Sequence, residues 1–138
     1  MRNLTFAIAA ALGVALAGSA LAHHAVNSEF AVNKTVQHKG VLTKIEMINP
    51  HSYLHFDVKQ GAKTVNFAVQ SGAPNVLRRA GLSARDNLIL GESYTFTVSP
   101  SRNGSPTGLM SSITLPDGKF FAFGAQGNID AARTLQGK

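Results

Sequence analysis

The sequence predicts an all-β protein with one short helix, and three observations lead to this fold class. From residue 35 onward, short stretches of alternating apolar and polar residues are separated by turn-forming residues. One proline-led stretch between the third and fourth of these has helical spacing. Cysteine is absent, so packing and hydrogen bonds must stabilise the fold without disulfides. The order of three strands, one helix and three strands is that of a small OB-like antiparallel barrel with five to six strands. A β-sandwich is the alternative.

The first two strands are expected on either side of a proline corner. The first covers residues 36–48, with Gly40 as a bend or bulge. Proline donates no hydrogen bond to a sheet and keeps the preceding residue extended, so Asn49-Pro50-His51 predicts a corner. The second strand then places one alternating apolar set on its inner face, namely Leu54, Phe56 and Val58.

The third strand and the helix follow a turn at Gln60-Gly61. The third strand has its own inward set, Val65, Phe67 and Val69. Pro74 suits the first turn of a short helix and Gly81 suits its end. Ser83 and Asp86 then resemble a capping box, which predicts a further helical turn over residues 83–88.

The last three strands are separated by two tight turns. Asn103-Gly104 and Asp117-Gly118 both tolerate positive φ and so favour hairpins. The strands around them carry apolar sets at Tyr94, Phe96 and Val98, at Leu109, Ile113 and Leu115, and at Phe120, Phe121 and Phe123. Residues 35–124 are therefore the predicted β-barrel domain, and residues 125–138 a polar C-terminal tail.

Residues 1–22 have the pattern of a secretory signal peptide. Arg2 is followed by an apolar run over residues 4–17, and Ala20 and Ala22 provide the small-x-small pattern of a cleavage site. We therefore expect a periplasmic or secreted protein that begins at His23, with residues 23–34 as an extended N-terminal segment. No later run reaches the roughly 20 apolar residues of a membrane span.

Composition argues against several classes of function. The chain has 13 Lys and Arg against 7 Asp and Glu, but the basic residues are scattered, and the outward faces lack stacking aromatics. With export, this predicts no nucleic-acid partner. No nucleophile elbow, phosphate-binding glycine loop or dinucleotide motif is present.

The expected mature N-terminus is a candidate copper site. Cleavage after Ala22 frees an α-amine on His23, and this amine and the His23 Nδ1 can close a chelate ring on one ion. One more imidazole would complete a three-nitrogen histidine brace, which suits Cu(II). A local alternative uses the α-amine, the deprotonated amide of His24 and the His24 imidazole. In both geometries the ligands must be deprotonated.

His51 is the best candidate for the distal imidazole, because it follows the proline corner in a loop. His55 lies four residues further along the expected strand, about 13 Å away, so the two cannot share one ion. His55 is expected to form a surface pair with Asp57, His38 to be solvated, and Glu46 to form an ion pair with Lys44. The predicted metal ligands are thus His23, His24 and His51.

Several of these motifs together resemble a family of small exported bacterial proteins, the domain-of-unknown-function family 6152. The resemblance covers residues 22–123 and implies export, but no activity. In this family tryptophan is common at the positions of Met47 and Leu82, and an aspartate is common where Ala31 stands. The motifs that carry the resemblance are His23-His24, residues 40–46, Asn49-Pro50-His51, residues 72–79, Asn103-Gly104-Ser105 and residues 115–119.

Three functional hypotheses follow from the sequence. The first is an exported, non-enzymatic domain that binds copper or another transition metal. The second is a metal-free binding or scaffold domain for a protein or an envelope polymer. The third is a hydrolase or lyase with a site around His51 and Asp57.

Overall fold

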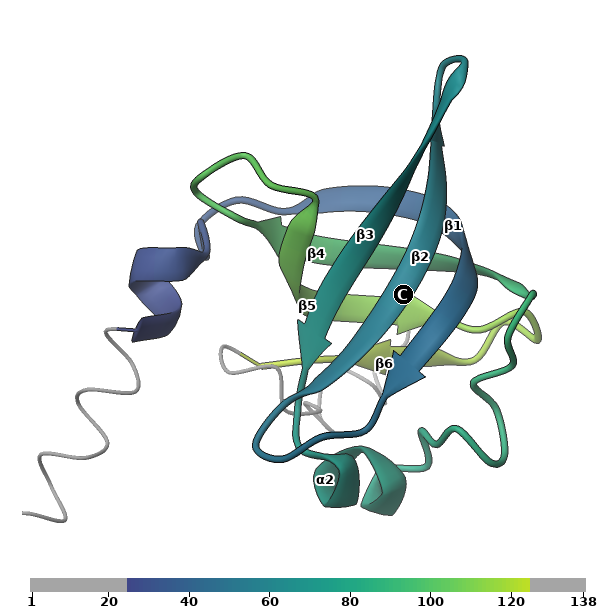
Figure 1. Ribbon diagram of the computed structural model, residues 1–138. Coiled ribbons are helices and arrows are strands. Elements are labelled where there is room, and N and C mark those ends of the chain that lie inside the picture. The colour runs from purple at the N-terminus through teal and green to yellow at the C-terminus, as the bar shows by residue number, and fades with distance from the viewer. Residues whose placement is uncertain (1–24, 125–138) are drawn as a thin grey trace, which may run out of the picture.

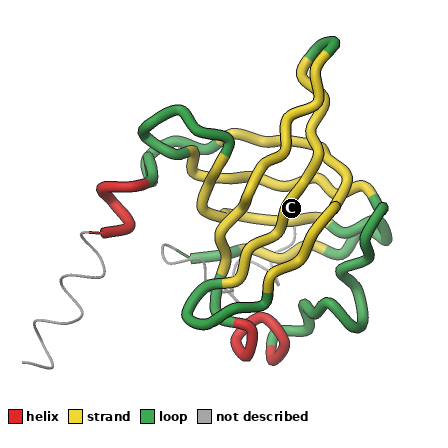
Figure 2. The backbone as a smooth tube through the Cα atoms, viewed as in Figure 1, coloured by secondary structure: helices red, strands yellow, loops and turns green. Residues whose placement is uncertain are grey.

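The computed structural model describes residues 25–124, which form a small β-barrel (Figures 1 and 2). A helical turn at residues 25–29 precedes the barrel. In chain order the elements are β1 (Val36–Glu46), β2 (Ser52–Gln60), β3 (Lys63–Ser71), α2 (Pro74–Arg79), β4 (Ser93–Pro100), β5 (Thr107–Thr114) and β6 (Phe120–Ala122). In this part of the chain no helix is long and apolar enough to cross a membrane.

The strand order closes the sheet into a barrel and confirms the predicted fold class. The order is β3-β2-β1-β4-β5-β6, and an additional pairing joins β3 to β5. This is the OB-type order, with α2 between β3 and β4. The closing pair β3–β5 is parallel, so the barrel is mixed rather than wholly antiparallel. Strand β6 pairs with β5 outside the closed ring of five strands.

Alternating side chains fill the barrel as the pattern predicts. Leu54 and Phe56 are fully buried, and the Phe56 and Phe96 rings stack with centroids 4.2 Å apart. Val65 is half-buried near the open end of the barrel. The buried core is Leu42, Leu54, Phe56, Val58, Val69, Leu77, Leu82, Leu88, Tyr94, Phe96, Val98, Met110, Ile113, Leu115, Phe121 and Phe123.

Strand β1 is shared by two partners and changes partner at Gly40. Its first half pairs with β4 and its second half with β2, and both ladders include Gly40. A Cβ on Gly40 would lie 2.9 Å from the Asp57 carbonyl oxygen, so only glycine lets the strands approach this closely. The bend predicted at Gly40 is therefore where β1 leaves one sheet partner for the other. A register shift between Leu42 and Lys44 adds a bulge just beyond it.

Helix α2 caps the end of the barrel where β2 begins and β3 ends (Figure 1). Pro74 lies in its first turn, and the fully buried Leu77 attaches it to the core. Gly81 has a φ of 90° just after the helix, as expected for a helix end. The predicted Ser83–Asp86 capping pair forms, with Ser83 Oγ 2.7 Å from Asp86 Oδ2. It closes a hydrogen-bonded turn over residues 84–87, in which the Asn87 N–H donates to the Ser83 carbonyl oxygen at 3.2 Å, the i to i+4 spacing of the single helical turn predicted there.

Candidate functional site

Of the three predicted metal ligands, His51 lies in the described part of the chain. His23 and His24 fall outside residues 25–124. His51 is half-buried in the connection between β1 and β2, directly after a cis Asn49–Pro50 peptide bond. The predicted corner is thus present, and β2 begins at the next residue.

The two nitrogens of the His51 ring have different surroundings. Nδ1 is buried and has no hydrogen-bond partner. Nε2 forms no hydrogen bond within residues 25–124, and unlike Nδ1 it is not fully buried. Nε2 therefore reaches solvent while Nδ1 faces the protein. A ring in this position has one nitrogen open to an external ligand.

His55 is held by other side chains through both ring nitrogens. Its Nε2 lies 2.6 Å from Glu46 Oε2, and its Nδ1 lies 3.4 Å from Asn66 Oδ1. The Asn66 amide in turn donates to Asp57 Oδ1 at 2.8 Å. The predicted His55–Asp57 pair is therefore wrong, because Asn66 stands between the two and Glu46 takes the histidine. His55 is not available as a metal ligand in this arrangement.

The same cluster contains the ion pair that the sequence predicted. Lys44 Nζ lies 2.7 Å from Glu46 Oε1. The Lys44 and His55 side chains, in that order of effect, hold the pKa of Glu46 below its usual range. Glu46 therefore stays ionised between two donors on the outer face of the barrel.

His38 is not solvated as predicted. Its ring packs against Phe67 and Phe96, with centroids 4.6 and 5.6 Å away. Burial lowers the pKa of His38. The alternation of β1 explains the error, because His38 shares the inward side with Gly40 and Leu42.

The segment before β1 is attached to the turn between β4 and β5. Phe30 is buried and forms an isolated bridge with Ser101. The Arg102 side chain donates through Nε to the Asn27 carbonyl oxygen at 2.8 Å. Residues 23–34 were predicted to be extended. Residues 25–29 instead form a helical turn.

This segment lies close enough to β2 to influence it electrostatically. Burial and then the charges of Glu29 and Glu46 raise the pKa of Tyr53. Tyr53 lies two residues after His51, at the same end of β2. The charge of Glu29 thus acts on the second residue of β2.

The described residues do not form a metal centre by themselves. Within residues 25–124, no three or more histidine, aspartate or glutamate side chains are grouped so that they could hold an ion.

Comparison with known proteins places the chain in a family. The model of the Family of unknown function (DUF6152) matches residues 11–111, well over half of the 138 residues. The chain belongs to this family. No curated protein and no solved structure matches it. The family assignment thus agrees with the resemblance seen in the motifs and carries no activity with it.

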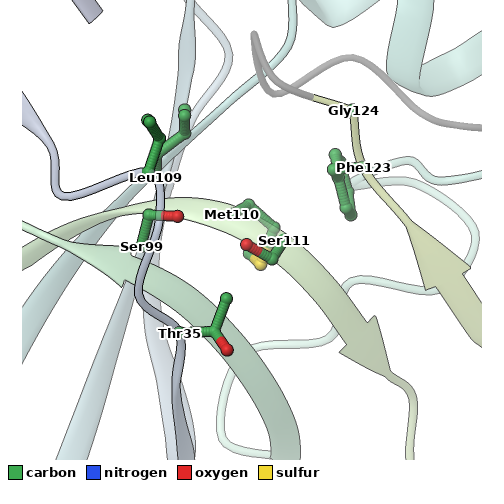
Figure 3. A pocket seen from close by; sticks show the side chains of 8 residues that line it. Thr35, Ser99, Leu109, Met110, Ser111, Phe123 and Gly124 are labelled. Atoms are coloured by element: carbon green, nitrogen blue, oxygen red, sulfur yellow. The ribbon is translucent and has the colours of Figure 1, made fainter. Parts of the chain in front are cut away.

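This family member also has surface pockets that the sequence did not predict, and two of them lie between strands distant in sequence. A groove of about 540 Å³ lies where the β2–β3 hairpin leaves β1, between Lys39 and Lys59. A smaller pocket of about 310 Å³ lies between the N-terminal segment and β5 (Figure 3). The hydroxyl-bearing residues Thr35, Ser99 and Ser111 contribute to its lining. Both pockets join strands distant in sequence, so no local motif indicates them.

The hydrolase or lyase arrangement predicted around His51 and Asp57 has no geometric support. The two residues lie six positions apart along β2, about 20 Å at the rise of a strand. The Asp57 carboxylate accepts a hydrogen bond from Asn66 rather than orienting a histidine.

Proposed function

We propose that this protein is exported to the periplasm or cell surface and binds copper through its processed N-terminus. The donors are the α-amine and Nδ1 of His23 together with the Nε2 of His51. His24 supplies the neighbouring imidazole and, in the local geometry, replaces His51. Nitrogen ligands of this kind suit Cu(II), which tops the affinity order of divalent ions. A role in copper storage, delivery or sensing would follow.

The observation that carries this proposal is the state of the His51 ring. Its Nδ1 is buried and its Nε2 faces solvent, on a corner fixed between two strands. His55 is engaged through both nitrogens, and His38 is packed between two phenylalanine rings. His51 therefore has the geometry of a side chain prepared to receive an external ligand.

The attachment of the N-terminal segment also supports the proposal. Phe30 and Arg102 fix residues 27–31 on the barrel. The proposed ligands His24 and His23 precede this attached segment by three and four residues in the chain. Restricting a ligand-bearing segment lowers the entropy lost on binding. Glu29, in the same segment, acts on the pKa of Tyr53, which lies two residues after His51.

The test is a copper titration of protein recovered from the cell after export. Intact mass first shows whether His23 is the first residue. The His51→Ala variant should then bind Cu(II) at least tenfold more weakly than the wild type, or about 1.4 kcal/mol. His55→Ala is the matched control, because His55 lies on the same strand but is already occupied by Glu46 and Asn66.

Two results would contradict the proposal. A first residue other than His23 removes the amine chelate. Equal copper affinity in wild type and His51→Ala contradicts the role given to His51, because any copper is then held by the adjacent histidines alone and the barrel supplies no ligand.

A second candidate function rests on the groove between Lys39 and Lys59. Both lysines are exposed, and within residues 25–124 neither forms an ion pair. Thr64 and Ser93 add hydroxyl groups to the same lining, and Asp57 adds one carboxylate, which accepts a hydrogen bond from Asn66. This chemistry suits a metal-free scaffold that holds an anionic envelope polymer.

The second candidate predicts salt-dependent binding to an immobilised anionic polysaccharide. The double variant Lys39→Gln/Lys59→Gln should bind several-fold more weakly than wild type at low salt. Lys34→Gln/Lys119→Gln, which removes the same two charges at exposed lysines outside the groove, is the control. Equal losses of binding in both variants would show that the polymer is attracted by net charge and does not use the groove.

A further inference from the structure

The buried polar atoms without partners are gathered at one end of the barrel. Among the described residues they are His51 Nδ1, Ser52 Oγ and Ser71 Oγ. Ser52 and Ser71 are both fully buried, whereas the ring of His51 is partly exposed. Unpartnered buried polar groups are rare in native proteins and call for an explanation at each position. Three such groups at one end of the barrel call for a common explanation.

The topology brings these three residues together. Ser52 is the first residue of β2 and lies directly opposite Ser71, the last residue of β3. Directly opposite residues have Cβ atoms about 5 Å apart and on the same face. His51 immediately precedes Ser52, and the Ser52 N–H donates to the Gly72 carbonyl oxygen at 3.1 Å. The next described element along the chain is α2, which covers this end of the barrel (Figure 1).

The chemistry of the three atoms is that of a water site. Each serine hydroxyl both donates and accepts a hydrogen bond, and an imidazole nitrogen does one or the other. A buried water molecule typically makes about three hydrogen bonds to polar groups that lack other partners. One water that bridges two hydroxyls and a ring nitrogen would satisfy all three atoms.

We infer that Ser52, Ser71 and the His51 Nδ1 together hold a buried water molecule that orients the His51 ring. The water accepts a hydrogen bond from Nδ1–H and donates to the serine oxygens. In this arrangement the ring is the Nδ1–H tautomer, which leaves a lone pair on Nε2, the nitrogen that faces solvent. Metal-binding histidines usually donate their other ring N–H to a carboxylate, a carbonyl group or a water molecule. Ser52 and Ser71 are thus positioning residues, and this last step rests on the proposed function.

The first test is the sign of a stability change in the metal-free protein. If the hydroxyls hold a water, Ser52→Ala and Ser71→Ala each lower the urea midpoint of unfolding, because the water loses a partner. If the hydroxyls are simply unsatisfied, each substitution raises the midpoint, because an unpaired buried group is removed. Ser99→Ala, at a buried serine in another part of the barrel, is the control. A raised midpoint overturns the inference.

The second test measures the tautomer directly. Nitrogen-15 shifts of the neutral His51 ring in the metal-free protein should show a protonated Nδ1 and an unprotonated Nε2. In the double variant Ser52→Ala/Ser71→Ala this preference should shift toward the Nε2–H form. A merely structural role for the serines would leave the tautomer unchanged, and that result overturns the inference.

The third test links the water site to copper. The same double variant should lose about tenfold to one hundredfold in Cu(II) affinity, the usual effect of removing an outer partner of a metal-binding histidine. Wild-type protein that binds no copper contradicts the proposed function, while the tautomer and the unfolding midpoints still decide the water site. Copper binding unaffected by the serines contradicts the positioning role.

Discussion

The three histidines within residues 25–124 have three different environments. His38 is packed between aromatic rings, His55 is bonded on both sides, and His51 has one buried and one solvent-facing nitrogen. These differences come from neighbours on other strands, so residue type alone does not reveal them. They separate a histidine that can act as a ligand from two that serve the fold.

At this scale we predict that His38 makes the barrel sensitive to acid. Burial lowers the pKa of His38, so the unfolded chain binds its proton more readily than the folded chain does. Stability from this group is complete above the ordinary histidine pKa of about 6.5 and is lost as the pH falls through the lowered folded value. Unfolding midpoints in urea between pH 7 and pH 4.5 measure this loss.

The His38→Phe variant should lose less stability than wild type over that pH range, because its ring cannot be protonated. Its remaining pH dependence comes from the other titrating groups. If the difference in urea midpoint between wild type and variant stays constant from pH 7 to pH 4.5, His38 does not contribute to the acid sensitivity.

At the scale of elements, β1 determines how the barrel closes. One strand serves two partners because Gly40 allows close contact with β2, and the bulge beyond it redirects the strand. The bulge also sets the register in which Glu46 reaches His55. The outer polar cluster is therefore a consequence of how β1 bends.

A side chain at Gly40 should disturb this arrangement. In Gly40→Ala the new Cβ meets the Asp57 carbonyl oxygen and Val58 Cγ2, both at 2.9 Å. The Asp57 backbone cannot move aside without disturbing the β1–β2 pairing. We therefore expect a loss of about 1–3 kcal/mol in the free energy of unfolding. Val41→Ala, the exposed neighbour, should change it by no more than about 0.5 kcal/mol. Urea denaturation compares the two, and equal effects would show that the close approach is unimportant.

The elements were more predictable than their contacts. Alternation at Leu54, Phe56 and Val58 identified the inner face of β2, because strand periodicity is a local property. The bulge between Leu42 and Lys44 leaves no local mark, so the Glu46–His55 pairing could not be predicted. The parallel β3–β5 closure joins residues about 40 positions apart and depends on the whole sheet. His51 was predictable as a corner residue. The burial of its Nδ1 without a hydrogen-bond partner was not, because it depends on how the barrel closes around the corner.

At the scale of the whole molecule, the segment before β1 is part of the folded barrel. Phe30 is buried against the β4–β5 end, and the Ala31 N–H donates to the Pro100 carbonyl oxygen at 2.9 Å. This attachment connects the region that follows the predicted cleavage site to the barrel. It gives the proposed N-terminal ligands a fixed neighbour.

Removing the Phe30 ring should therefore destabilise the barrel and not only release its N-terminal segment. We expect Phe30→Ala to cost about 3–5 kcal/mol in the free energy of unfolding, the usual range for a buried phenylalanine. Val32→Ala, two residues away and exposed, should cost no more than about 0.5 kcal/mol. If Phe30→Ala has the same urea midpoint of unfolding as wild type, the segment is only loosely attached to the barrel.

The most direct measurement of the copper site compares exported protein that begins at His23 with a form carrying three additional N-terminal alanines. The extra residues move the free amine away from the His23 imidazole, place no histidine third from the new amine, and leave the barrel and every histidine in place. We predict that the extended form binds Cu(II) at least tenfold more weakly, with fewer nitrogen ligands in its electron paramagnetic resonance spectrum. Equal affinities and identical spectra would contradict a copper site built on the His23 amine.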